Sequence, residues 1–180
     1  WGRNCYRYRI RRKETQMIKL GLIGTPISHS LSPGIHQGFM KNEGLQGSYE
    51  LFELRHLPEE GLNRFMNSRD LIGINVTIPF KQTVIEHLDE VDELALELNA
   101  VNTVVKKNNR LIGYNTDVYG IEQSLNSLSP KGTSALIFGA GGAARAVFNV
   151  LTKRGFKARL VSRNLRNSAY QDLNLSEFTL

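Results

Sequence analysis

A glycine-rich segment between two regular patterns constrains the fold of this chain more than any other feature. Residues 139–144 read Gly-Ala-Gly-Gly-Ala-Ala, after a short apolar run at 135–138 and before a helical pattern that extends to Lys153. A further apolar run follows at 157–161. Strand, glycine turn, helix and strand in this order match the G-x-G-x-x-[GA] pattern of a dinucleotide-binding βαβ unit. The alternative is a glycine-rich turn that binds no ligand.

Three positions of this segment have a physical role in the dinucleotide interpretation. Gly139 permits the tight turn, Gly141 lets the backbone approach a pyrophosphate, and Ala144 allows the helix to pack closely on the strand. The helix N-terminus then offers free N–H groups and a partial positive charge to the phosphates. The expected cofactor contacts in this segment are Gly139, Ala140, Gly141, Gly142 and Ala143.

The end of the second strand indicates which dinucleotide would bind. An NAD site places Asp or Glu about 20 residues after the glycines, where it binds the ribose 2′-hydroxyl. This chain has Ser162, Arg163 and Asn164 there, without an acid. A guanidinium can pair with a 2′-phosphate, so the segment favours NADP. The alternative is a surface arginine with no role in binding.

Upstream of the glycine segment, short runs rich in β-branched residues alternate with helical patterns. Alternation of this kind predicts the α/β class with parallel βαβ units. Residues 129–134 are rich in turn formers and separate this region from the glycine segment. We expect strands at 18–24, 49–54 and 72–78, helices at 32–44, 57–67, 80–88, 91–98 and 117–128, and a hairpin of 101–107 and 110–114 with Asn108 and Asn109 at its turn.

Charge and composition bound the domain organisation. The net charge of +6 is concentrated in residues 1–16, which hold six Arg or Lys and one Glu. This basic arm could bind nucleic acid or anionic lipid, could be a targeting peptide, or could be a disordered or artefactual tail, which we favour. We therefore expect three regions: the arm at 1–16, an α/β substrate-binding domain at 17–117, and the first part of a Rossmann-type domain at 118–180.

The single cysteine, Cys5, excludes an intrachain disulfide and favours a reducing compartment, which predicts the cytoplasm. No run approaches the roughly 18 apolar residues of a membrane span, so no membrane partner is expected. The histidines and the cysteine do not stand at the spacing of metal ligands, and no metal is expected.

The segment Asn75-Val-Thr-Ile-Pro-Phe-Lys81 combines a strand with polar side chains at its end. Asn75 and Thr77 share one face of the strand, because side chains alternate. Pro79 ends the strand and places Lys81 in the first turn of the expected helix, near the positive end of the helix dipole, which favours loss of its proton. The alternative for Lys81 is a solvated surface lysine.

Further polar groups follow other strands. Ser28 and Ser30 come after the first strand, and in an extended segment their hydroxyls would face the same way toward a carboxylate or hydroxyl. They could equally be turn residues before Ser32, the expected helix N-cap. Asn102 begins the hairpin, and Asp117 follows it, where the carboxylate could instead cap the next helix.

Together these segments resemble the shikimate dehydrogenase family. The resemblance extends from residue 17 to about residue 170, with the segments in the family's order and at about its spacing. The segments that carry it are Gly24-Thr-Pro-Ile-Ser-His-Ser-Leu-Ser-Pro33, Asn75–Lys81, Ala100-Val-Asn-Thr103, Gly113-Tyr-Asn-Thr-Asp117 and Gly139-Ala-Gly-Gly-Ala143.

The resemblance implies NADPH-dependent, reversible reduction of 3-dehydroshikimate to shikimate, a step of chorismate and aromatic amino acid biosynthesis. It implies Lys81 and Asp117 as the catalytic pair and Arg163 as the 2′-phosphate contact. A developing alkoxide needs a proton and nearby positive charge, which a lysine paired with a carboxylate supplies. The residues implied to bind the substrate or line its pocket are Ser28, Ser30, Asn75, Thr77, Lys81, Asn102, Thr116 and Asp117.

The chain departs from the family in two respects. Ser162-Arg163-Asn164 replaces the usual Asn-Arg-Thr, and the chain has 180 residues, too few for a complete nucleotide-binding domain of the family. We therefore expect the chain itself to bind NADP poorly and to turn over slowly or not at all. The alternatives are a quinate/shikimate dehydrogenase and a non-catalytic module that binds polyhydroxy acids. Nucleic-acid binding is not favoured, and a monomer or a homodimer is expected.

Overall fold

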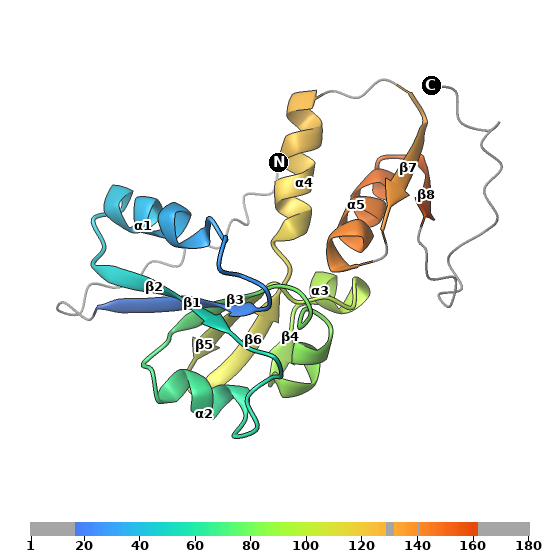
Figure 1. Cartoon of the computed structure of the whole chain (residues 1–180). Coiled ribbons are helices and arrows are strands. Elements are labelled where there is room, and N and C mark those ends of the chain that lie inside the picture. The colour runs from blue at the N-terminus through green and yellow to red at the C-terminus, as the bar shows by residue number, and fades with distance from the viewer. Residues whose placement is uncertain (1–16, 129–131, 140, 162–180) are drawn as a thin grey trace.

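The computed structural model describes residues 17–128, 132–139 and 141–161, and it confirms the α/β class. The strands form a mixed six-stranded sheet and a separate two-stranded parallel sheet, and helices pack against both (Figure 1). The sequence-based predictions for residues 1–16, for Ala140 and for Ser162, Arg163 and Asn164 lie outside the described residues.

The six-stranded sheet is parallel at one end and mixed at the other. Strand β1, second in the sheet, pairs in parallel with β2 and with β3, whereas β5 pairs antiparallel with both β3 and β6. The strand order is β2 (Gly47–Glu53), β1 (Ile18–Gly24), β3 (Gly73–Val76), β5 (Thr103–Lys107), β6 (Arg110–Tyr114) and β4 (Glu90–Val91). The expected parallel units are present in β1, β2 and β3, and the expected hairpin adds antiparallel pairs beside β3.

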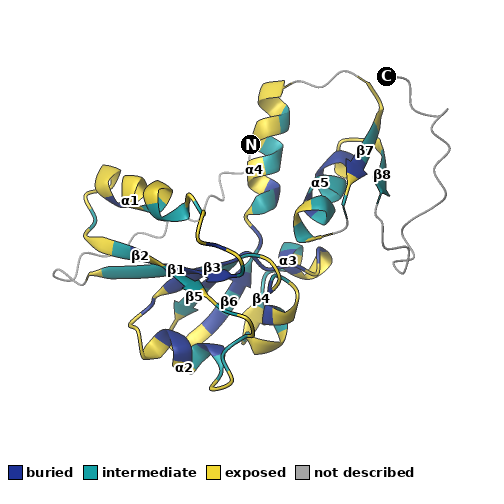
Figure 2. Ribbon diagram, in the orientation of Figure 1, coloured by how far each residue is buried: buried dark blue, intermediate teal, exposed yellow. Residues whose placement is uncertain are grey.

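Helices cover both faces of this sheet. On one face α1 (Ser32–Asn42) packs through Met40 against Leu22 and Tyr49. On the other face α2 (Leu62–Asn67) contributes Phe65 and Met66 to the main core. Figure 2 shows the buried residues along the central strands, while most of α1 is exposed. The residues that end β1 and β3 therefore lie at one edge of a firmly packed layer.

The hairpin of β5 and β6 forms as predicted. Its turn residues Asn108 and Asn109 have positive φ angles of 51° and 60°. Two successive residues with positive φ are typical of a type I′ turn, which matches the twist of paired strands, and asparagine tolerates this conformation better than most residues.

Three predicted helices differ in the structure. The helix expected at 57–67 begins only at Leu62, because Gly61 has a φ of 87°. The segment 80–88 forms a short 3-10 helix, η1 (Thr83–His87), and 91–98 shortens to α3 (Glu93–Glu97). Helix α1 begins at Ser32 itself, so Ser32 is not the N-cap; the hydroxyl of Ser30 accepts a hydrogen bond from Ser32 N at 3.2 Å.

The second unit contains α4 (Asp117–Leu128), β7 (Ser134–Phe138), α5 (Gly142–Lys153) and β8 (Lys157–Val161). Helix α5 packs against α4 through Ala146 and Val150, in a cluster that also holds Leu98 and Ala100 of the first unit. None of the helices in the described part of the chain is long and apolar enough to cross a membrane.

Candidate functional site

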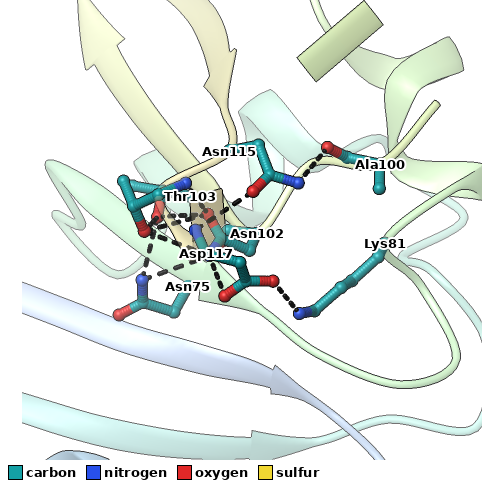
Figure 3. A network of polar contacts seen from close by, with 8 residues as sticks. Asn75, Lys81, Ala100, Asn102, Thr103, Asn115 and Asp117 are labelled. Atoms are coloured by element: carbon teal, nitrogen blue, oxygen red, sulfur yellow. Dashed lines mark hydrogen bonds and ion pairs between the residues drawn. The ribbon is translucent and has the colours of Figure 1, made fainter. Parts of the chain in front are cut away.

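Lys81 and Asp117 form an ion pair at the edge of the six-stranded sheet. The Lys81 Nζ lies 2.6 Å from Asp117 Oδ2, and the two side chains are 17% and 27% exposed (Figure 3). Lys81 lies in the turn after Pro79, and Asp117 is the first residue of α4. The helix expected at Lys81 does not form, so the dipole argument for this lysine is wrong. The charge closest to the Lys81 ammonium is instead the carboxylate of Asp117.

The second carboxylate oxygen of Asp117 is held by an amide. Asn102 Nδ2 donates to Asp117 Oδ1 at 2.7 Å. The capping interaction at this helix comes from Asn115, whose Oδ1 accepts from Asp117 N at 3.0 Å while its Nδ2 donates to Ala100 O at 2.9 Å. The carboxylate of Asp117 is thus directed at Lys81 and Asn102, and Asn115 takes the capping role.

A cavity of about 230 Å³ opens beside this ion pair, and we call it the lysine cavity. Polar side chains from three parts of the chain, among them Asn75, Thr77 and Asn102, line it together with the pair. Its full lining consists of Leu22, Ser32, Ile35, His36, Asn75, Val76, Thr77, Lys81, Asn102 and Asp117. One cation, one anion and several amides and hydroxyls around a small cavity suit a ligand rich in hydroxyl groups.

A second hollow of about 200 Å³, the serine cavity, adjoins the first, since both are lined by Leu22, Ser32 and Thr77. Ser30 lines the serine cavity, whereas Ser28 is exposed and lines neither hollow. The segment is not extended as expected, because Ser30 N bonds Ile27 O at 2.9 Å and closes a turn. The serine pair that faces the cavities is therefore Ser30 and Ser32, joined hydroxyl to hydroxyl at 3.1 Å.

Asn102 is the centre of the polar network at the lysine cavity. Its side chain is 8% exposed, and its Oδ1 accepts from the backbone N of Thr116 at 3.0 Å. Thr116, an expected pocket residue, is itself exposed, and its hydroxyl lies within hydrogen-bond distance of both ends of the Asn102 amide. Asn75 joins the same network across the sheet through Thr103. The backbone of this segment thus determines how the amide of Asn102 faces Asp117.

His36 and Tyr49 form a stacked pair at the α1 side of the cavity. Their ring centroids lie 4.3 Å apart with an interplanar angle of 14°, and Tyr49 donates its hydroxyl to Asn75 Oδ1 at 2.8 Å. Burial lowers the pKa of His36 below its ordinary value of 6.5, partly offset by the Asn75 side chain. Burial also raises the pKa of Tyr49 to about 12, partly offset by the Ser32 hydroxyl. Both rings are therefore neutral near pH 7.

Gly139 and Gly141 lie between β7 and helix α5. Gly139 has a φ of 123°, which favours glycine, and its N–H bonds Val161 O at 2.7 Å. Gly141 is the N-cap of the 12-residue helix α5 and offers no side-chain acceptor to the first turn. The N–H groups of that turn are thus available to an anion, so the segment fits the dinucleotide phosphates expected from its sequence.

Gly142 brings this helix into contact with the lysine site. A Cβ built on Gly142 would lie 3.2 Å from Ala100 Cβ and 3.3 Å from Lys81 Cδ. The first turn of α5 therefore packs directly on the aliphatic part of Lys81, a side chain that lines the lysine cavity.

Sequence reasoning missed several side chains of the site. Ser32 was assigned to a helix cap, whereas His36, Tyr49 and Thr103 were not singled out, because their placement depends on how α1 packs on the sheet and on how its strands lie side by side. Within residues 17–128, 132–139 and 141–161, no three His, Cys, Asp or Glu side chains come together in a way that could hold a metal ion.

Comparison with known proteins supports one family. Residues 22–104 match the model of the shikimate dehydrogenase substrate binding domain. The shikimate dehydrogenase (NADP(+)) of Oceanobacillus iheyensis is 46% identical over 147 residues, which cover 77% of this chain and 52% of that protein. The chain thus spans about half the length of the curated relatives it matches.

Solved structures agree with this match. The shikimate dehydrogenase of Aquifex aeolicus superposes with a TM-score of 0.76 at 41% identity, covering 86% of this chain and 59% of that one. The enzyme of Thermus thermophilus, solved in complex with NADP(H) and shikimate, gives a TM-score of 0.72 at 38% identity, covering 82% and 57%.

The fold and the site define an α/β domain with a small polar cavity, packed against a βαβ unit that contains the glycine segment. Within this class, the matching family model and relatives decide the family. The chain belongs to the shikimate dehydrogenase family.

Proposed function

We propose that the protein catalyses the NADP-dependent, reversible reduction of 3-dehydroshikimate to shikimate. The observation that carries this proposal is the Lys81–Asp117 ion pair in the wall of a small polar cavity, with Gly142 of the glycine segment packed against the Lys81 side chain. Residues 17–117 act as the substrate-binding domain and residues from 118 onward as part of the nucleotide-binding domain. The single cysteine of the chain favours a cytoplasmic location.

Different side chains of the two cavities would bind different groups of the substrate. Asn75, Thr77, Asn102 and Asp117 offer donors and acceptors to the ring hydroxyls of shikimate. The hydroxyls of Ser30 and Ser32 in the adjoining serine cavity suit the substrate carboxylate, with Thr116 at the edge of the site. Ser28 is left out of this proposal because it lines neither cavity, whereas Thr116 is kept because its hydroxyl bonds Asn102, which lines the lysine cavity.

Lys81 is the proton donor in the proposed reduction. A nicotinamide dinucleotide, when bound, supplies the hydride to the ketone carbon. The ketone oxygen gains negative charge at that moment, and the Lys81 ammonium stabilises this charge and transfers a proton to the oxygen. Asp117 orients the ammonium at 2.6 Å, and Asn102 holds Asp117 in place. In shikimate oxidation the same lysine takes up the proton.

The dinucleotide would be held by the glycine segment and by the region after β8. Gly141, Gly142 and Ala143 would offer backbone N–H groups to the phosphates, together with Ala140, while Gly139 shapes the turn. Arg163 with its neighbours Ser162 and Asn164 would contact the 2′-phosphate. The name and the solved complex of relatives support NADP over NAD.

Substrate and cofactor titrations test the proposal. We expect calorimetry to show shikimate binding to the chain, with quinate binding more weakly, and we expect NADPH rather than NADH to form where turnover is detected. Shikimate binding without turnover in any form of the protein, including longer ones, would favour the non-catalytic alternative. Equal rates on quinate and shikimate would favour a quinate/shikimate dehydrogenase. Absence of shikimate binding would contradict the proposal.

A further inference from the structure

The hydroxyl of Thr103 joins three side chains of the proposed substrate site, although Thr103 lines neither cavity. Thr103 is the first residue of β5 and lies directly opposite Asn75 in the antiparallel pair with β3. Its Oγ1 donates to Asn102 Oδ1 at 2.9 Å and accepts from Asn75 Nδ2 at 3.2 Å (Figure 3). It also lies 3.5 Å from Thr116 Oγ1.

These contacts use the proton and one lone pair of the hydroxyl, with the hydroxyl of Thr116 nearby. A threonine hydroxyl has one proton to donate and two lone pairs to accept with. The proton goes to Asn102, one lone pair accepts from Asn75, and Thr116 lies within reach of the other. A methyl group in the same place would make none of these bonds.

The orientation of the Asn102 amide depends on these bonds. A backbone N–H can only donate, so the bond from Thr116 N identifies the oxygen end of the amide. The Thr103 hydroxyl donates to the same oxygen, and the Nδ2 end then faces Asp117 Oδ1 at 2.7 Å. Since Lys81 holds the other oxygen of Asp117, the influence of Thr103 extends to the ion pair.

The Asn75 amide is fixed by the same hydroxyl. Its Oδ1 accepts from Tyr49, and its Nδ2 donates to Thr103 at 3.2 Å and to Asn102 O at 3.4 Å. Asn75 lies in strand β3 and Asn102 lies directly before β5, at the start of the hairpin. The Thr103 side chain links the two amides. Networks of this kind in partly buried sites fix the direction of each member more strongly than a single bond does.

We propose that Thr103 is a positioning residue: its hydroxyl holds the amides of Asn75 and Asn102 so that Asn102 directs Asp117 toward Lys81. The proposal rests on the function proposed above, because it assigns Thr103 a role in the site that binds shikimate. It predicts that loss of this hydroxyl changes ligand affinity even though Thr103 does not touch the cavity.

A three-variant series separates this role from strand packing. Thr103→Val keeps the β-branched shape that suits a strand but removes the hydroxyl, whereas Thr103→Ser keeps the hydroxyl and loses the methyl group. Thr152→Val is the matched control, since Thr152 is exposed and its hydroxyl donates to Phe148 O within its own helix. We expect shikimate affinity to fall by about tenfold in Thr103→Val and to stay within about threefold of wild type in the other two variants.

A second measurement tests Thr103 independently of the ligand. The side-chain amide protons of Asn102 are observable by NMR, and we expect slow solvent exchange in the wild type and Thr103→Ser but faster exchange in Thr103→Val. If Thr103→Val does not fold, Thr103→Ala takes its place in both experiments. Wild-type amide exchange and wild-type affinity in the hydroxyl-free variant would overturn the proposal. If the wild type binds no shikimate, the proposed function fails, whereas amide exchange still decides the role of Thr103.

Discussion

The ammonium nitrogen of Lys81 lies 2.6 Å from a carboxylate oxygen of Asp117, although 36 positions separate the two residues in the chain. Two backbone hydrogen bonds bring the segments of these residues together. Val101 N bonds Lys81 O at 2.7 Å, and Asn102 N bonds Tyr114 O at 3.0 Å, three residues before Asp117. The ion pair therefore depends on the hairpin that places β6 beside β5, and the folded sheet holds it in position.

Removing the Lys81 amine should affect turnover more than binding. In a form of the protein that shows shikimate-dependent NADPH formation, we expect Lys81→Ala to lower turnover by about 10²–10⁴-fold, because the proton donor is lost. Shikimate affinity, measured by calorimetry, should fall by about tenfold. Lys19→Ala is the control, since Lys19 pairs with the exposed Asp70 away from the site. Turnover of Lys81→Ala close to that of wild type would refute the role of Lys81.

Phe65 should account for a large part of the stability of the main core. Its side chain is 3% exposed and meets the Phe52 ring edge to face at 5.3 Å. We expect Phe65→Ala to lower the free energy of unfolding by about 3–5 kcal/mol, as measured by urea denaturation. Phe39→Ala, at a residue 61% exposed, should cost less than about 1 kcal/mol. Equal losses in the two variants would contradict the assignment of the core.

His36 should make the protein less stable as the pH falls below 6.5. Burial lowers the pKa of His36 in the folded state, so the unfolded chain takes up the proton first. The stability contribution of neutral His36 is present above pH 6.5 and is lost between pH 6.5 and the lower folded pKa. Urea unfolding of wild type and His36→Gln across this range checks the prediction, with exposed His87→Gln as control. An unchanged pH dependence in His36→Gln would argue against it.

Two glycine substitutions should have opposite effects on stability. A methyl group at Gly142 would press on Ala100, which is fully buried, and on Lys81, so we expect Gly142→Ala to cost about 1–3 kcal/mol and to weaken shikimate binding. A methyl group at Gly120 in α4 meets open space, and Gly120→Ala should stabilise the protein by about 0.5–1 kcal/mol. Chemical denaturation of both variants measures the difference. A stabilising Gly142→Ala would show that α5 does not pack as described.

Local sequence signals predicted the elements whose conformation is decided locally. The paired asparagines at 108 and 109 marked the hairpin turn, and the glycines at 139–144 marked the strand-to-helix turn. The α-helix predicted for residues 80–88 was wrong. Val84 and Phe80 pack into the core and the segment forms a short 3-10 helix, which helical periodicity does not reveal. Strand β4 was missed because its two residues are defined by pairing with β6 alone.

The candidate site was predictable to the extent that its residues lie within or next to the predicted strands and the hairpin. Asn75, Thr77, Lys81, Asn102 and Asp117 were singled out on that ground, and the structure brings them to one cavity. Their roles stay predictions until they are tested. Side chains that reach the site across the sheet gave no such signal, because the antiparallel insertion of β5 beside β3, which places Thr103 opposite Asn75, is not apparent from either segment alone.

A crystal structure of the protein with shikimate tests the central claim most directly. We expect shikimate in the lysine cavity, with one ring hydroxyl within about 3.2 Å of both the Lys81 amine and the Asp117 carboxylate and with its carboxylate near Ser30 and Ser32. Shikimate bound elsewhere, or a Lys81 and an Asp117 that point apart into solvent, would contradict the account.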